Sequence, residues 1–202
     1  MTIPNPRCSR SLFPALEQHR DSWNNCQGCI LHETAKQKVF YRGDLPCDIL
    51  FVGDVPGPAE DDLGVPFIGP MAPIFNTILE RSLTALLPRK LKYAITNAVL
   101  CKPPIKENTV ESPREPDKDE LKACSSRLAS FLALGSPKLV VGVGKVADKA
   151  LLQAFMSNDI YYRTLSINHP GFIERSDDKQ REIERAVLQL TQALQRIFGE
   201  GK

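Results

Sequence analysis

Strand-like and helix-like segments alternate along most of this chain. Four short segments favour strands: 49–52, 93–100, 139–143 and 163–167. Two of them, Ile-Leu-Phe-Val at 49–52 and Leu-Val-Val-Gly-Val at 139–143, are almost wholly apolar, as strands covered on both faces of a sheet are. The pattern predicts four strands of a buried sheet.

Each strand-like segment is followed by a segment that we expect to be helical. The predicted helices cover Met71–Leu87, Asp117–Leu134, Gly144 to about Phe155, and Ser176 or Asp177 to Phe198. In three of them the apolar residues recur at helical spacing and therefore fall on one side. Asp117 is the predicted N-cap of the second helix, and Gly199 is the predicted C-cap of the last.

The order of the segments is β-α-β-α-β-α-β-α, which is typical of a parallel sheet covered on both faces. We therefore predict an α/β fold with three layers, α/β/α, around a central four-stranded parallel sheet. Ligands bind such sheets beyond the carboxyl ends of the strands. Four segments lie directly after the predicted strands: Gly53–Gly57, Cys101–Pro104, Gly144–Lys145 and Asn168–Pro170.

Length and charge set broad limits. A chain of 202 residues suits one domain, and its formal net charge of +2 neither requires nor excludes nucleic acid. No apolar run approaches the roughly 20 residues that a membrane helix needs, so no membrane partner is expected. We predict an N-terminal extension over residues 1–25, with a short helix around Leu12–Arg20, and one domain over residues 26–202.

The sequence has six cysteines and no apolar core of a secretory signal, which indicates a reducing compartment. Cys26 and Cys29 form a Cys-x-x-Cys pair. Cys101 closes the second predicted strand, and Cys124 lies in the helix that follows it. This spacing leaves a zinc ion, an iron–sulfur cluster, a redox dithiol and structural thiols open. Cys8 and Cys47 have no such spacing, and we expect inert, partly buried thiols.

The most specific text is GDVPGPAEDDLGVPFIG over residues 53–69. Its glycines and proline make a tight turn with exposed backbone amides, which suits a phosphate or an anionic transition state. Asp54 and Glu60 add carboxylates, and Phe67 offers a stacking surface. We expect Asp61 and Asp62 to form a solvated turn.

This segment, TNAVLCKPP over 96–104 and the His169-Pro170 pair resemble the motifs of the family 4 uracil-DNA glycosylases, the iron–sulfur branch of that superfamily. The resemblance extends from about Cys26 to Phe198. It implies a uracil-DNA-glycosylase-like domain that acts on single- or double-stranded DNA containing uracil, in base-excision repair. It also implies a monomer in the cytoplasm, encoded by a prokaryote or a phage.

The resemblance further implies a role for each site residue. A [4Fe–4S] cluster would be held by Cys26, Cys29, Cys101 and Cys124. The flipped uracil would meet Gly53, Val55, Phe67, which stacks on it, and Asn97, which pairs with its O4 and N3 edge. His169 would donate to the anionic O2 of the leaving base, and Asp54 or Glu60 would orient water or stabilise the cationic sugar.

Two departures from the family pattern keep other functions open. Asp54 stands where the family has glutamate, and residues 105–116 replace a short Asn-Arg-x-Pro segment. One alternative is a catalytically inactive nucleic-acid-binding module on the same fold. A second is a glycosylase for another damaged or modified base, and a third is a zinc-binding structural protein without a DNA function.

Overall fold

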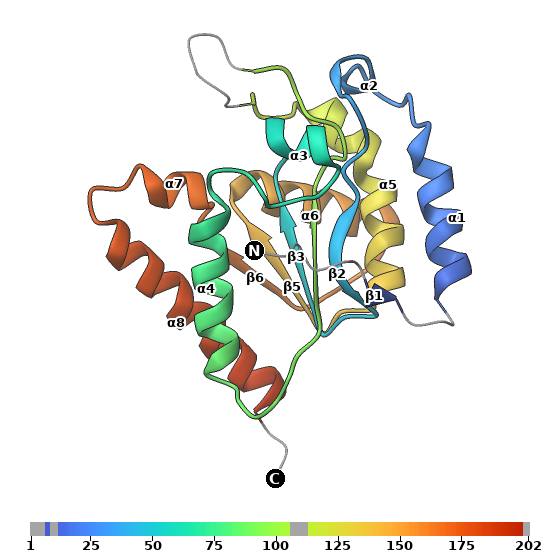
Figure 1. Ribbon diagram of the computed structural model, residues 1–202. Helices are drawn as coiled ribbons and strands as arrows, with labels where there is room; N and C mark the ends of the chain where they lie inside the picture. Colours follow the sequence, from blue (N-terminus) through green and yellow to red (C-terminus); the bar gives the residue numbers. More distant parts are fainter. Residues whose placement is uncertain (1–6, 9–11, 106–112, 200–202) are drawn as a thin grey trace.

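The computed structural model describes residues 7–8, 12–105 and 113–199. Within these ranges the strands form one sheet in the order β1-β2-β4-β3-β5-β6. Figure 1 shows helices on both sides of it, so the predicted three-layer α/β/α fold is confirmed.

The four strands expected from the sequence form the parallel centre of the sheet. They are β4 (Tyr93–Asn97), β3 (Ile49–Gly53), β5 (Leu139–Val143) and β6 (Thr164–Ile167). β3 pairs in parallel with β4 and β5, and β5 pairs in parallel with β6. Gly53 lies beside Asn97 in the β3–β4 register, which sets two of the predicted site residues next to each other.

The sheet is wider than the predicted four strands. β2 (Tyr41–Leu45) pairs antiparallel with β4, and the two-residue β1 (Arg7–Cys8) pairs parallel with β2. β2 reads Tyr-Arg-Gly-Asp-Leu and has no apolar run, and of its five residues only Arg42 and Leu45 are buried. The hydrophobic pattern therefore carried no signal for it.

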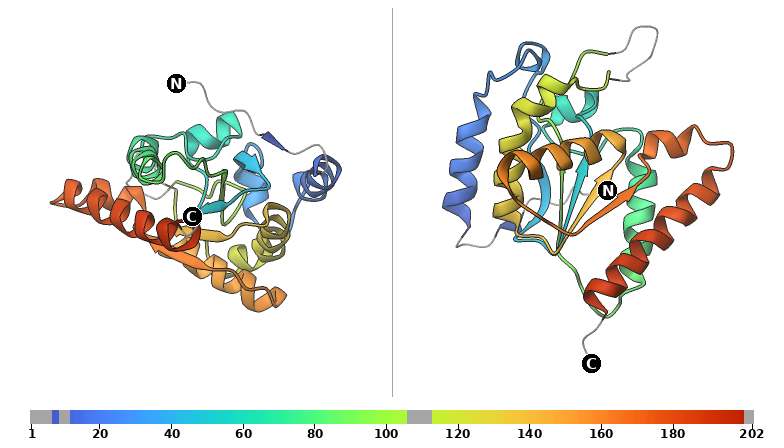
Figure 2. Two further views of the ribbon diagram at one scale, coloured as in Figure 1. Left: turned by 90° about the horizontal axis from the view of Figure 1, so that it is seen from below. Right: turned by 180° about the vertical axis from the view of Figure 1, so that it is seen from behind.

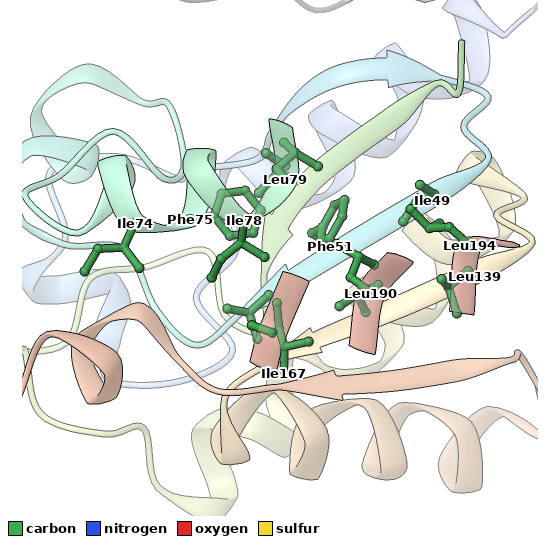
Figure 3. Packing of buried hydrophobic residues seen from close by; sticks show 14 of the residues in the cluster. Ile49, Phe51, Ile74, Phe75, Ile78, Leu79, Leu139, Ile167, Leu190 and Leu194 are labelled. Atoms are coloured by element: carbon green, nitrogen blue, oxygen red, sulfur yellow. The ribbon is translucent and has the colours of Figure 1, made fainter. Parts of the chain in front are cut away.

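Alternate residues of each central strand face opposite helical layers. Ile49 and Phe51 belong to a core with α4 (Ala72–Thr84) and α8 (Lys179–Phe198), which Figure 3 shows from close by. Leu50 and Val52 belong to a second core with α5 (Lys118–Gly135) and α6 (Lys145–Asn158). The views from below and behind in Figure 2 show the same two layers.

The long helices lie where the sequence predicted them, with small shifts at their ends. α4 ends at Thr84, and α6 continues to Asn158. Asp117 caps α5 as predicted: its carboxylate accepts from the Glu120 amide at 2.9 Å. Gly199 is the C-cap of α8, also as predicted.

One helix lies outside the two main layers, and three short ones lie near the carboxyl ends of the strands. α1 (Phe13–Asn24) packs against α5, where His19 Nδ1 lies 3.2 Å from Ser130 Oγ. The short helices are α2 (Leu31–Thr34), α3 (Pro58–Leu63) and α7 (Pro170–Glu174), labelled in Figure 1. They are too short to leave a periodic pattern in the sequence.

Candidate functional site

The carboxyl ends of β3 and β4 bring an aromatic ring and an amide together over a glycine. A Cβ atom built on Gly53 would lie 2.5 Å from Phe67 Cζ and 2.6 Å from Asn97 Oδ1. Both side chains therefore lie against the backbone of Gly53, at a spacing that only glycine allows. Two residues predicted to contact the same base are neighbours in the structure.

Phe67 has an unusual backbone conformation, with φ of 58°. This left-handed region costs a non-glycine residue roughly 1–3 kcal/mol and persists only where the surroundings impose it. Arg42 donates to the Phe67 carbonyl at 3.4 Å, and the ring packs on Phe75 with centroids 4.6 Å apart. The protein thus fixes the ring beside Asn97 from both its backbone and its side chain.

Glu60 is buried, and its carboxylate accepts two backbone amides. Oε2 accepts from Gly57 at 2.7 Å, and Oε1 accepts from Ile68 at 3.2 Å. Burial raises the pKa of Glu60, while these amides act in the opposite direction. Glu60 therefore braces the turn after β3 against the loop that carries Phe67.

Asp54 follows β3 and caps a neighbouring helix. Its Oδ1 accepts from the Ala147 amide, in the first turn of α6, at 2.9 Å. Burial raises the pKa of Asp54 to about 7, although the bond from Ala147 lowers it. The Asp54 carboxyl thus changes charge near neutral pH, within a helix N-terminus that favours the anion.

His169 follows β6 and caps α7. Its Nδ1 accepts from the Gly171 amide at 3.1 Å, so the proton of the neutral ring lies on Nε2. Burial lowers the pKa of His169 to about 4, and the nearby Arg175 adds to the effect. At neutral pH the side chain is an uncharged imidazole with a single N–H donor at Nε2.

Gly144 links Asp54 to His169. A Cβ atom built there would lie 2.9 Å from His169 Cβ and 3.2 Å from Asp54 Oδ1. Gly53 contacts Phe67 and Asn97, and the next residue, Asp54, lies near His169 across Gly144. The ends of β3, β4 and β6 therefore meet as the parallel topology predicts.

Asn97 is 1% exposed, and its Nδ2 has no hydrogen-bond partner within the described ranges. A buried donor without a partner costs about 1–3 kcal/mol and calls for an explanation, of which a ligand that accepts from it is one. Val55, the remaining predicted base contact, packs against the apolar residues around Cys101 and Cys124. The structure thus places Val55 between the strand edge and the cysteines.

The four cysteines of the predicted ligand set line one cavity. They come from the segment before α2, the segment after β4, and α5: Cys26, Cys29, Cys101 and Cys124. Lys38 and His32 line the same cavity, and the Gly28 amide donates to Cys26 Sγ at 3.4 Å. Residues almost 100 positions apart thus share one sulfur-rich site.

Burial is the main cause of a raised pKa at Cys29, Cys101 and Cys124. It raises the pKa of Cys101 to about 11 and also raises that of Cys124. The charges of neighbouring thiols add to this effect, while Lys38 opposes it at Cys101. Four thiolates would repel one another here unless a positive group held them together, so the donors fit a metal centre.

Within the described ranges, no three His, Cys, Asp or Glu side chains stand in a set that would hold a single metal ion. Cys47 lies outside the cavity: it is buried, and burial raises its pKa to about 12. It is the inert thiol that its lack of spacing predicted. The side chain of Cys8 lies outside the described residues.

The expectation of a solvated turn is wrong for Asp61 and right for Asp62. Asp61 is 0% exposed and accepts from the Lys36 amide at 3.0 Å, whereas Asp62 is exposed and pairs with the Lys36 ammonium. The reason is α3, whose first turn directs one of two adjacent carboxylates inward. Asp61 thereby ties α3 to the segment before β2.

Sequence reasoning missed two buried arginines. Arg42 on β2 supports Phe67, and Arg127 on α5 donates to the Asn97 carbonyl at 2.6 Å. Neither stands in a motif, and arginine in a helix or an outer strand usually marks a solvated face. Only their position in the fold reveals them.

The loop between Cys101 and Cys124 is closed at its base. Ile105 bridges to Pro113, and Arg114 forms a two-point ion pair with the buried Glu120 at 2.5 and 2.8 Å. Residues 106–112 of the predicted loop lie outside the described residues. The part that is described anchors the loop to the start of α5.

A stacking ring, a free amide and a neutral imidazole at one strand edge are what a site for a planar, hydrogen-bonding ring requires. The fold is that of a three-layer α/β protein with these groups gathered at the carboxyl ends of its parallel strands. The chain belongs to the uracil DNA glycosylase superfamily, whose family model matches residues 40–192.

The chain is similar to three Type-4 uracil-DNA glycosylases. It is 30% identical over 138 residues to that of Pyrobaculum aerophilum, covering 68% of this chain and 65% of the relative. It is 29% identical over 161 residues to that of Archaeoglobus fulgidus, covering 80% and 70%. It is 27% identical over 175 residues to that of Thermotoga maritima, covering 81% and 84%.

The chain spans slightly less than two thirds of the Pyrobaculum relative's length. Among solved structures, it is similar to the crystal structure of wild-type SMUG2 from Pedobacter heparinus, with a TM-score of 0.55 and 19% identity. That match covers 74% of this chain and 76% of the other. It supports the fold. None of the helices in the described part is long and apolar enough to cross a bilayer.

Proposed function

We propose that this chain is a uracil-DNA glycosylase, which hydrolyses the bond between uracil and deoxyribose in DNA during base-excision repair. One observation carries the proposal: the Gly53-Asp54 dipeptide lies between the Phe67–Asn97 pair and the neutral His169. The similarity to the three Type-4 enzymes supports the same conclusion.

Recognition would use the ring and the free amide. An enzyme that acts on a base in DNA must take it out of the stack, and the flipped base then needs an aromatic surface. Phe67 supplies that surface beside Gly53. Asn97 carries an unpartnered N–H donor for uracil O4 and an oxygen that accepts from N3–H. Cytosine presents the opposite pattern at these two positions, so the amide favours uracil.

His169 would stabilise the leaving group. When the C1′–N1 bond breaks, its electron pair leaves with uracil, and the negative charge spreads to O2. The imidazole accepts from Gly171 at Nδ1, which leaves Nε2–H free to donate to that oxygen. A neutral donor with a fixed tautomer needs no proton transfer before the bond breaks.

Asp54 and Glu60 would act on the sugar side in different ways. The ionised Asp54 carboxylate would stabilise the cationic sugar and orient the water that adds to C1′. Glu60 already accepts two backbone amides, which favours a positioning role that holds Phe67 in place. Val55 would support the turn from the side of the cysteines.

The four cysteines would hold a [4Fe–4S] cluster. Four cysteines around one cavity fit a metal centre, and the resemblance of their motifs to the iron–sulfur branch of the family favours a cluster over a zinc ion. Such a cluster would serve as a structural link, since its ligands come from the segment before α2, the segment after β4, and α5. It therefore places the Cys26–Cys29 segment within the domain of residues 26–202, with residues 1–25 as an extension.

We further propose that the protein acts as a monomer in the cytoplasm on single- or double-stranded uracil-containing DNA. The test is release of free uracil from both kinds of oligonucleotide by wild-type protein. Release of the base from oligonucleotides that carry hypoxanthine, xanthine or 5-hydroxymethyluracil, compared with release of uracil, tests for a preference for another base. Tight binding to uracil DNA without release of any base would instead indicate an inactive binding module.

A further inference from the structure

Arg127 connects the cysteine site to the base-reading strand end. It lies on α5 one turn after Cys124, and its side chain is 1% exposed. One guanidinium nitrogen donates to the carbonyls of Asn97 and Ala98 at 2.6 and 2.7 Å. The other terminal nitrogen lies 3.3 Å from Thr96 Oγ1, so the guanidinium holds three consecutive residues at the end of β4.

The charge of Arg127 has no carboxylate partner within the described ranges. A buried cation without a counter-charge is strongly destabilising. Burial accordingly lowers the pKa of Arg127, and negative charge at Cys124, Cys101 and Cys26 would raise it. Because the buried Cys124 lies one turn before the buried Arg127 on α5, an anionic centre at the cysteines would lie near the guanidinium and act as its counter-charge.

Both ends of the contact matter for the proposed chemistry. Asn97 carries the unpartnered side-chain amide, and its backbone carbonyl accepts a hydrogen bond from Arg127. A cluster held by four thiolates is a net anion, and a buried positive charge beside it favours the reduced form. An exposed positive charge would be screened by water and would have little effect.

We propose that Arg127 is a positioning residue that uses the negative charge of the cysteine-bound cluster to hold Asn97 in place for uracil. The inference rests on the proposed function for the roles of Asn97 and the four cysteines. Arginine suits this task because one terminal nitrogen donates to two carbonyls while the other reaches Thr96 Oγ1, and a lysine ammonium, with a single nitrogen, does not reproduce this.

The experiment compares three variants of the full chain purified with its cluster. Arg127→Met removes charge and donors, Arg127→Lys keeps the charge but not the fork, and Lys122→Met removes an exposed charge from the same helix. Iron content, the reduction potential of the cluster, and kcat and KM on uracil DNA are measured for each.

We expect a more negative potential in Arg127→Met, and a potential close to that of wild type in Arg127→Lys and Lys122→Met. KM should rise about tenfold in both Arg127 variants, as for loss of one charged hydrogen bond, with a smaller change in kcat. If Arg127→Met does not fold, Arg127→Gln takes its place, because it also removes the charge.

An unchanged potential in Arg127→Met, or an unchanged KM in Arg127→Lys, would overturn the inference. Protein that holds no iron cluster would overturn it as well. A wild-type chain that releases no uracil would refute the proposed function alone, because a shifted potential in Arg127→Met would still support the contact between Arg127 and the cluster.

Discussion

At the scale of single residues, the chemistry of His169 depends on one backbone bond. The amide of Gly171 occupies Nδ1, so the ring keeps its proton on Nε2, and burial holds it neutral down to a pKa of about 4. A side chain that looks like a pH switch in the sequence is therefore a fixed donor at physiological pH.

We expect His169→Ala to lower the rate of uracil release by about 100- to 1,000-fold, as for loss of one oxyanion donor. Single-turnover assays on a uracil oligonucleotide measure the effect. Asn168→Ala is the matched control, because the neighbouring Asn168 side chain donates to Glu182 at 2.8 Å. An equal loss of uracil-release rate in both variants would show that His169 has no special role.

The raised pKa of Asp54 predicts a pH dependence. Because only the ionised carboxylate stabilises a cationic sugar, the rate of wild-type excision should rise from about pH 5 and level off above about pH 8. Asp54→Asn should be slower and lack this rise. Rates measured across the range check it, and a wild-type profile without the rise would contradict the assignment.

Stability gives a second readout of the same group. The folded protein binds the Asp54 proton more firmly than the unfolded chain, so this contribution is complete below the ordinary pKa of 3.8 and is lost as pH rises through about 7. The melting temperature of Asp54→Asn relative to that of wild type should therefore increase as the pH rises from about 5 to about 8.

At the scale of elements, the site depends on how close two segments approach the end of β3. The Phe67 loop and Asn97 meet over Gly53, and Glu60 and Arg42 hold the loop from either side. The turn after β3 is thus a rigid support rather than a mobile loop, and its geometry should be sensitive to one methyl group.

We expect Gly53→Ala to reduce excision by about 100-fold, because its Cβ would displace Phe67 or Asn97 by roughly an ångström. Gly69→Ala is the control, since a Cβ there meets nothing within 4 Å. Steady-state kinetics and thermal unfolding of both variants separate lost activity from lost stability. A fully active Gly53→Ala would show that the two side chains need not be so close.

At the scale of the molecule, the cysteine site joins parts of the chain that the sheet alone does not connect. Cys26 and Cys29 precede β2, whereas Cys101 lies in the segment after β4 and Cys124 lies in α5. A metal centre that binds only the folded arrangement adds its binding free energy to folding. Loss of one ligand should therefore affect the whole domain.

We expect Cys124→Ser to lose most of its iron and to melt roughly 5–10 °C lower than wild type. Cys47→Ser, which removes a buried thiol outside the cavity, should keep its iron. Iron analysis and thermal unfolding measure the two effects. Full iron content in Cys124→Ser would exclude Cys124 from the ligand set.

The sequence by itself determined the order of the four central strands and the long helices between them, and which residues meet at one edge of the sheet. The apolar runs of β3 and β5 and the helical spacing of α4, α5 and α8 are local signals, and they persist whatever the chain packs against. Their alternation implies a parallel sheet, which brings the residues after the strands to one edge. Gly53, Asn97 and His169 are therefore identifiable from their positions in the sequence alone.

Only the tertiary structure decided how these residues are held. The pairing of β2 with β4, the burial of Asp61 and the contact of Arg127 with Asn97 join residues far apart in the chain. Polar side chains carry no periodic signal for such contacts, because solvated and buried arginines look alike in a sequence. The free amide of Asn97 and the charge balance at the cysteines follow from packing, which determines which polar groups lose water and which find a partner.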